Sequence, residues 1–312
     1  MVNLTGYPYA GYYFSRPAGR LHYLDEGSAD APAVVCVHGN PTWSFFFRDL
    51  VPALRPHHRV IVPDHLGMGR SDRPEESRYD YRLKSRIDDL EALLAHTVPT
   101  GRVSLVVHDW GGLIGLGWAT RHPHRIDRLV ILNTAAFPLP AGKQLPWQLW
   151  LVRHTFLGSL LVRGFNAFVR GLVSFCSVRR LAPAVRAGYL APYRTWRDRL
   201  AVLRFVQDIP LQPGDPSFAE MTRIAEALPS LADKPMLIGW GLRDFVFDAD
   251  FLAEWRRRFP RATVLELADA AHLVLEDAGE QLLPHIVAHL SECPEGRFEA
   301  TEMLAQEARH ER

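Results

Sequence analysis

Short apolar runs alternate with amphipathic stretches along the first 137 residues and again after Lys234. Runs of apolar and β-branched residues are typical of buried strands, and apolar residues recurring every three or four positions are typical of helices. The predicted strands are 21–27, 33–39, 59–67, 102–109, 128–135, 235–241 and 262–269. The predicted helices are 44–56, 81–98, 113–122, 248–260 and 279–292. This alternation predicts an α/β fold, a mostly parallel sheet flanked by helices on both faces.

The strand signals are interrupted once. Residues 138–230 contain proline-punctuated helical segments rich in Trp, Phe, Leu and Arg. We therefore predict an α/β core made of 1–137 and 231–293, with an inserted helical cap at 138–230. The polar residues 294–312 are expected to form a C-terminal tail that frays.

Charge and cysteine content narrow the class of protein. The chain has 36 lysines and arginines against 35 acidic residues, so no basic face for nucleic acid is expected. Cys36 lies inside an apolar strand, which favours a buried free thiol over a disulfide. The N-terminus lacks a signal-peptide pattern, and arginines interrupt the most apolar segment, 149–175. We therefore expect a soluble, cytoplasmic enzyme.

Polar residues follow four of the predicted strands. These are Asn40, Asp109, Asp244 and His272. Ligands of an open parallel sheet bind beyond the carboxyl ends of its strands, so these side chains are expected to meet there. The chain order of nucleophile, acid and histidine is that of α/β-hydrolases.

The stretch VVHDWGG predicts a strand, a sharp turn and a helix, with Asp109 at the tip of the turn. Many hydrolases carry a serine at this tip, and the strained turn needs small residues on either side of it. In this chain Val107 and Gly111 hold those flanking positions. An aspartate after a strand can also be a plain helix N-cap. With an ordinary pKa of about 3.9, a carboxylate is ionised at neutral pH and needs no activating base. It attacks an sp³ carbon that bears a leaving group, and the product is an alkyl ester.

His272 and an acid complete the predicted chemistry. The imidazole would take a proton from the water that attacks the ester. A carboxylate is needed to orient the imidazole, and Asp244 is the expected partner. Asp248 and Asp269 are the alternatives.

Asn40 and Trp110 are predicted to bind the leaving group. Their side-chain N–H groups can hold an anion that develops beside the nucleophile. Their backbone N–H groups could also stabilise a tetrahedral ester intermediate. The alternatives are a turn residue for Asn40 and core packing for Trp110.

The remaining histidines and glycines indicate no cofactor. We interpret His38 and His108 as structural hydrogen-bond partners, and His57 and His58 as solvated. The scattered histidines are not interpreted as a metal site, and no glycine pattern matches a dinucleotide fingerprint.

The segments HGNPTWSFFFR, PDHLGMGRSDRP, VHDWGG, GLRD and AAHLVLED closely resemble the haloalkane dehalogenases of the α/β-hydrolase superfamily. The resemblance spans roughly residues 10–290. It implies Asp109 as nucleophile, His272 as base and Asp244 as acid, with Asn40 and Trp110 as the halide clamp. One subfamily takes its acid from a glutamate after the strand that ends near Asn133, which cannot supply a charge. Asn40 together with Asp244 is the combination of the third subfamily.

A closer resemblance lies in the cap. NTAAFPLP, RGFNAF and YLAPYRTWRDRLAVLRFVQDIPL look like the β-lactone decarboxylases of bacterial long-chain olefin biosynthesis. This resemblance implies conversion of a cis-3,4-dialkyl β-lactone to a cis-alkene and CO₂. Asp109 would attack the ring carbon that bears oxygen, or the carbonyl with help from His272. It also implies association with a β-lactone synthetase and other enzymes of the pathway, and an oligomer is possible.

Other functions remain as alternatives. Haloalkane dehalogenation uses every one of these residues. An epoxide hydrolase would need cap tyrosines, for which Tyr189 and Tyr193 are candidates, but it has no use for Asn40 as a clamp. A fluoroacetate-type enzyme would need arginines beside Asp109. A non-catalytic scaffold is the alternative from a different class.

Overall fold

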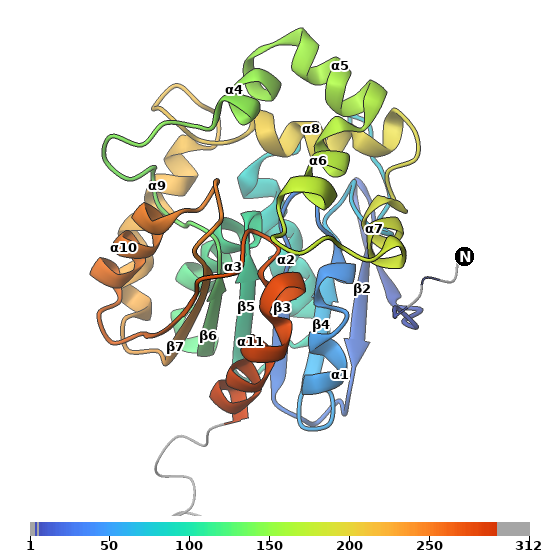
Figure 1. Ribbon diagram of the computed structural model, residues 1–312. Helices are drawn as coiled ribbons and strands as arrows, with labels where there is room; N and C mark the ends of the chain where they lie inside the picture. Colours follow the sequence, from blue (N-terminus) through green and yellow to red (C-terminus); the bar gives the residue numbers. More distant parts are fainter. Residues whose placement is uncertain (1–3, 5, 292–312) are drawn as a thin grey trace, which may run out of the picture.

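The computed structural model describes Leu4 and residues 6–291 (Figure 1). The predicted tail 294–312 and Cys293 lie outside the described residues. The described residues form one sheet in the order β1-β2-β4-β3-β5-β6-β7-β8. The strands are β1 Tyr12–Arg16, β2 Gly19–Glu26, β3 Ala33–Val37, β4 Arg59–Pro63, β5 Val103–His108, β6 Ile126–Leu132, β7 Met236–Gly241 and β8 Thr263–Leu267. Strands β3 to β8 pair in parallel, and β1 and β2 form an antiparallel edge. The predicted α/β fold is confirmed.

The strand β1 is an addition to the predicted set. It lies at the sheet edge, and Tyr12 and Tyr13 are exposed on it. Because an exposed edge strand buries few side chains, it carries no apolar run that a sequence pattern could detect.

Alternating strand residues pack into two separate cores. Val35 and Val37 of β3 face one core, whereas Val34 and Cys36 face the other. The helices of the first face are α2 Leu83–Thr97, α3 Trp110–Arg121, α9 Phe218–Ala227 and α10 Ala249–Arg258. Those of the second are α1 Leu50–Leu54 and α11 Val274–Ser291. Cys36 is a buried free thiol, as predicted.

Five helices lie above the carboxyl ends of the strands (Figure 1). They are α4 Trp147–His154, α5 Phe156–Phe165, α6 Ala167–Phe175, α7 Pro183–Leu190 and α8 Leu200–Gln207. Helix α9 lies within the 138–230 range but packs on α2 and α3 beside the sheet. Short 3₁₀ turns complete the described elements: Ser44–Phe47, Pro123–Arg125, Arg197–Arg199 and Leu228–Leu231.

A buried carboxylate fastens one end of the cap to the core. Asp208, at the C-terminal end of α8, accepts hydrogen bonds from the Leu83 N–H over 2.8 Å and from the Ser217 hydroxyl over 2.8 Å. It also pairs with Arg82 and Arg86, over 3.0 and 3.2 Å. One side chain therefore ties the end of α8 to the starts of α2 and α9.

No helix among the described residues is both long and apolar enough to cross a membrane by itself. Helices α5 and α6 together have the length and composition, but they are bent by 76° relative to each other.

Candidate active site

Asp109 sits on a strained turn between β5 and α3. Its φ of 51° and ψ of −127° lie outside the regions that most residues occupy, and such strain costs about 1–3 kcal/mol. The turn is possible because Gly111 approaches β3 closely: a Cβ there would lie 1.9 Å from the Val37 carbonyl oxygen. Asp109 stands at the N-cap position of α3, but its side chain does not cap the helix.

The Asp109 carboxylate is buried and held by backbone donors. The Asn40 N–H donates to its Oδ1 over 2.5 Å, and the Trp110 N–H also favours the charged form. Burial raises the pKa of Asp109, and the pull of His272 and these N–H groups only partly opposes it. The site therefore presents a poorly solvated carboxylate in a fixed position.

His272 lies between two carboxylates. Its Nδ1 is 2.8 Å from Oδ2 of Asp244, and its Nε2 is 3.8 Å from Oδ2 of Asp109. Burial opposes a charge on the imidazole, but Asp244 and then Asp109 outweigh it and raise the pKa of His272. The structure confirms the prediction that Asp109, Asp244 and His272 lie close together.

Asn133 has a structural role in the site that was not predicted from the sequence. Its Nδ2 donates to Asp244 Oδ2 over 3.1 Å, and its Oδ1 accepts from the Gly241 N–H over 2.8 Å. The Val246 N–H donates to the other oxygen of Asp244 over 2.8 Å. Asn133 cannot supply a charge itself, but it orients Asp244, the carboxylate that does.

The two alternative acids are engaged elsewhere. Asp248 accepts from the Asp250 N–H as the N-cap of α10 and forms an ion pair with Lys143. Asp269 is exposed and pairs with Arg243 over 2.6 Å. Asp244 is thus the acid that contacts His272.

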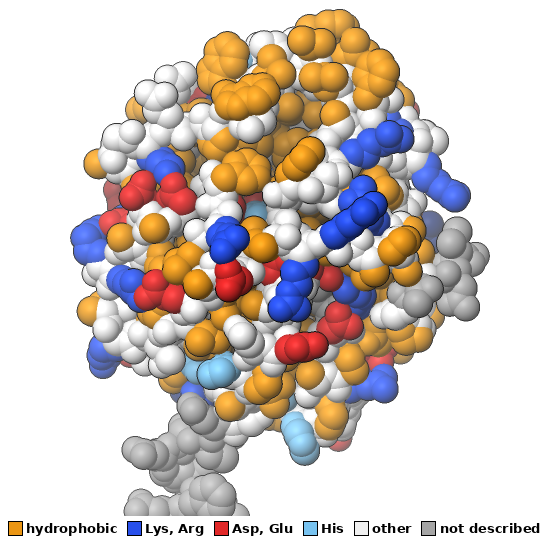
Figure 2. Space-filling view, viewed as in Figure 1, with side chains coloured by type: hydrophobic (Ala, Val, Ile, Leu, Met, Phe, Trp, Pro, Cys, Tyr) orange, Lys and Arg blue, Asp and Glu red, His pale blue; other side chains and the backbone are white. Residues whose placement is uncertain are grey.

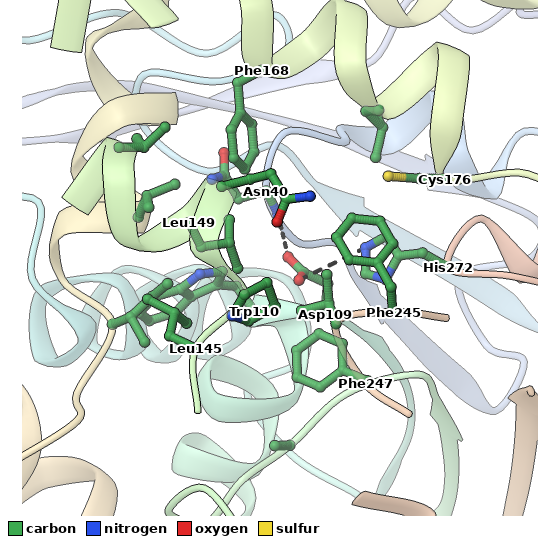
Figure 3. A pocket seen from close by; sticks show the side chains of 18 of the residues that line it. Asn40, Asp109, Trp110, Leu145, Leu149, Phe168, Cys176, Phe245, Phe247 and His272 are labelled. Atoms are coloured by element: carbon green, nitrogen blue, oxygen red, sulfur yellow. Dashed lines mark hydrogen bonds and ion pairs between the residues drawn. The ribbon is translucent and has the colours of Figure 1, made fainter. Parts of the chain in front are cut away.

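Asn40 and Trp110 both line the cavity beside Asp109 (Figure 3). The Asn40 Nδ2 donates to the backbone carbonyl of Val202 in α8 over 3.1 Å, which leaves its second N–H for another acceptor. The Trp110 indole packs edge-to-face on Phe205, with ring centroids 5.2 Å apart. The guanidinium of Arg86 lies 5.5 Å from the Trp110 ring, a contact that no local pattern could predict.

The structure fits the interpretation of His38 and His108 as structural hydrogen-bond partners. His38 accepts a hydrogen bond from the His65 N–H, and a ring nitrogen of His108 bonds the His272 carbonyl over 2.8 Å. Burial lowers the pKa of His38 and His108, so both rings are neutral. The prediction for His58 was wrong: its ring is buried, within 3.2 Å of the Leu290 carbonyl, because α11 covers that loop.

An apolar cavity of about 650 Å³ opens above Asp109. Cap residues such as Leu149, Phe168 and Leu172 form its walls, and Asp109 and His272 lie at its base (Figure 3). No tyrosine or arginine lines it in the described part of the chain. Tyr189 is instead bonded to Glu276 over 2.5 Å, and Tyr193 is buried outside the cavity, which removes the acids that an epoxide hydrolase would need.

Cys176 is a further cavity residue that was not predicted. Burial and the nearby carboxylates raise its pKa to about 12, so it is a neutral thiol and not a competing nucleophile. Among the described residues, no cluster of three or more His, Cys, Asp or Glu is arranged to hold a metal ion.

Comparisons with known proteins show the family of this chain. The family model of the alpha/beta hydrolase fold matches residues 32–279. The chain is 52% identical over 287 residues to a cis-3-alkyl-4-alkyloxetan-2-one decarboxylase from Shewanella oneidensis, covering 91% of this chain and 89% of that protein. It is 50% identical to a protein of the same name from Xanthomonas campestris, covering 92% of this chain and 99% of the relative.

Haloalkane dehalogenases are more distant relatives. The enzyme from Mycobacterium marinum is 33% identical, covering 92% of this chain and 95% of that protein. The crystal structure of a haloalkane dehalogenase from Bradyrhizobium elkani superposes with a TM-score of 0.79 at 26% identity, covering 89% of this chain and 96% of that one. The chain therefore belongs to the α/β-hydrolase family, and within it to the group that unites the cis-3-alkyl-4-alkyloxetan-2-one decarboxylases with the haloalkane dehalogenases.

Proposed function

We propose that this enzyme decarboxylates a cis-3,4-dialkyl β-lactone to a cis-alkene and CO₂. One observation carries the proposal: the carboxylate of Asp109 lies at the base of a large apolar cavity that the side chains of Asn40 and Trp110 also line. Relatives about half identical to this chain bear the name of that substrate class and reaction. The apolar walls suit two alkyl chains.

In the first step, Asp109 attacks the ring carbon that carries the ring oxygen. A bond forms between an Asp109 oxygen and that carbon, and the ring carbon–oxygen bond breaks with inversion at the carbon. The released electron pair becomes part of a free carboxylate. Asn40 and Trp110 then donate to this carboxylate, as they would to any departing anion.

In the second step, the new carboxylate leaves as CO₂. The electrons of its carbon–carbon bond form the double bond, and the ester bond to Asp109 breaks, which restores the carboxylate. Inversion followed by anti elimination yields the cis-alkene from the cis-lactone. No water or proton is consumed, so His272 transfers no proton in either step.

The test supplies purified enzyme with a synthetic cis-3,4-dialkyl β-lactone and measures alkene and CO₂. Alkene is expected from the wild type and from Asp269→Asn, a change at an exposed aspartate. Asp109→Asn, which keeps the side-chain shape, is expected to form none. Alkene formation by Asp109→Asn at the wild-type rate would overturn the proposal.

Hydrolysis of haloalkanes is the second candidate, favoured by the 3.8 Å separation of His272 Nε2 from Asp109. Here the ester on Asp109 is cleaved by a water that His272 deprotonates. With a 1-bromoalkane, His272→Gln should then accumulate an alkyl ester on Asp109, visible by mass spectrometry. With the lactone no ester should accumulate, because the second step needs no water. Bromide release without any alkene would make hydrolysis the function.

We further propose that the reaction is a step of olefin biosynthesis in the cytoplasm, next to a β-lactone synthetase. The chemistry supports this proposal, since a strained lactone must be supplied by an enzyme that closes the ring. Co-purification of the tagged chain with such a synthetase from the native cell tests it. Recovery of the chain without a synthetase would count against the assembly.

A further inference from the structure

Six large apolar side chains of the cap point into solvent. We name this set the cap surface: Trp147, Trp150, Phe156, Leu157, Phe165 and Phe175. Trp147, Phe156 and Phe175 are 71%, 82% and 78% exposed. Figure 2 shows hydrophobic side chains gathered at the top of the molecule, over α4, α5 and α6. Extended apolar patches on soluble proteins mark sites of interaction.

The helices beneath the cap surface are apolar on two sides. Helix α5 buries Val162 in the cap and exposes Phe156 and Phe165. Helix α6 buries Val169 and exposes Phe175 in the same way. The bend of 76° between the two helices suits a pair that lies along an apolar boundary rather than one that crosses it.

The cap is strongly basic although the chain as a whole is nearly neutral. The cap residues 138–230 carry twelve lysines and arginines against five acidic residues, and 144–207 alone carry ten arginines and one acidic residue, Asp198. Arg170, Arg179 and Arg180 are exposed, and none of the three forms an ion pair within the part of the chain that the structure describes. Basic side chains stand at the right-hand margin of the cap surface in Figure 2.

The cap surface is continuous with the mouth of the cavity. Trp147 and Phe175 belong to the cap surface and also line the cavity. Phe245, which is 45% exposed, lines the same mouth. An apolar molecule can therefore pass between the surface and the base of the cavity along apolar side chains.

We propose that the cap surface docks on an anionic phospholipid bilayer, with its aromatic side chains among the headgroups and the cavity mouth toward the membrane. Tryptophan next to arginine is the composition that favours a bilayer interface with anionic lipids. A second copy of the chain fits poorly, because two basic caps would face each other. Docking itself is independent of the proposed function, whereas exchange of an apolar substrate through the mouth rests on it.

The test measures flotation with vesicles of phosphatidylethanolamine and phosphatidylglycerol, and with vesicles of phosphatidylcholine alone. We expect binding to the anionic vesicles, a blue shift of tryptophan emission, and weaker binding at high salt. The triple variant Phe156→Ser, Leu157→Ser, Phe165→Ser changes residues that do not line the cavity, and it should lose at least about tenfold in binding. Arg170→Glu with Arg180→Glu should lose a similar factor, since each cation near such a surface contributes on the order of fivefold.

Matched variants far from the cap serve as controls. Tyr12→Ser with Tyr13→Ser removes exposed aromatic side chains from β1, and Arg55→Glu with Arg102→Glu reverses exposed charges on the core. Both should bind vesicles like the wild type, and so should Asp109→Asn, whatever its activity. The proposal is overturned by absent vesicle binding, by equal losses in the control variants, or by light scattering that shows the cap surface pairing two copies instead.

Discussion

The side-chain amide of Asn40, at the end of β3, donates a hydrogen bond to the backbone carbonyl of Val202 in cap helix α8 over 3.1 Å. The cap thereby sets the orientation of a residue that belongs to the core. The second N–H of the same amide is the one available to a departing anion. In the proposed reaction, leaving-group binding and the position of the cap are therefore coupled through this side chain.

Asn40→Asp keeps the shape of this side chain but removes both N–H groups. A carboxylate would also face the Val202 carbonyl and lie close to Asp109, which disfavours its ionisation. We expect alkene formation to fall by about 10²–10³-fold, as for loss of one anion-binding donor. Single-turnover assays with a β-lactone would measure this, and an unchanged rate would show that the Asn40 amide does not bind the leaving group.

Gly39 leaves no room for a side chain next to the nucleophile. A Cβ at this position would lie 2.0 Å from Oδ1 of Asp109. Gly39→Ala should therefore displace the carboxylate and abolish turnover. Gly214→Ala is the matched control, because a Cβ there meets nothing within 4 Å and activity should persist. Comparable activity of the two variants would contradict the observed packing.

The raised pKa of Asp109 predicts two pH effects. Because the deprotonated form attacks, activity should decline as the pH falls through a pKa above the ordinary value of about 3.9. The raised pKa of Asp109 also affects the free energy of unfolding. The stability is fully present below the ordinary carboxyl pKa, and part of it is lost as the pH rises through the raised pKa, because the buried carboxyl then becomes charged. Asp109→Asn should consequently raise the Tm at pH 7 by roughly 2–4 °C, while abolishing activity.

Calorimetry at several pH values tests the stability effect. The Tm difference between Asp109→Asn and the wild type should shrink as the pH falls through the raised pKa of Asp109, and it should be smallest below about 3.9, where the carboxyl is protonated in both the folded and the unfolded state. A lower Tm for the variant at pH 7 would refute the burial penalty at Asp109.

Gly171 of α6 offers a way to change substrate length. It lines the cavity, and a Cβ there meets no atom within 4 Å. Gly171→Leu should fill part of the cavity without strain in the helix. We expect kcat/KM to drop for long-chain lactones and to hold for short ones, in a series of substrates of graded length. An equal loss of kcat/KM for substrates of all lengths would show that the alkyl chains do not lie beside Gly171.

The sequence predicted what depends on local pattern. The apolar runs correctly placed the parallel strands, and the strand ends correctly identified Asp109, Asp244 and His272 as neighbours. Parallel strands bring their carboxyl ends to one edge, so chain order alone was enough for this part of the site.

The rest depends on contacts between distant segments. The bond from Asn40 to Val202 spans 162 positions, and that from Asn133 to Asp244 spans 111. The local periodicity of apolar residues gives no information about pairs so far apart in the chain. Likewise, α9 looks like any other helix of the inserted region, yet its buried face, including Ile224, fits against α2 and α3.

The fastening at Asp208 restricts how the lid over the site can move. This carboxylate is buried and holds the end of α8 to α2 and α9. The start of the cap is held by Lys143, which pairs with Asp248 and, over 3.2 Å, with Asp250. Because salt screens pairs that are open to solvent more than buried ones, high ionic strength should loosen the start of the cap before it loosens the end of α8.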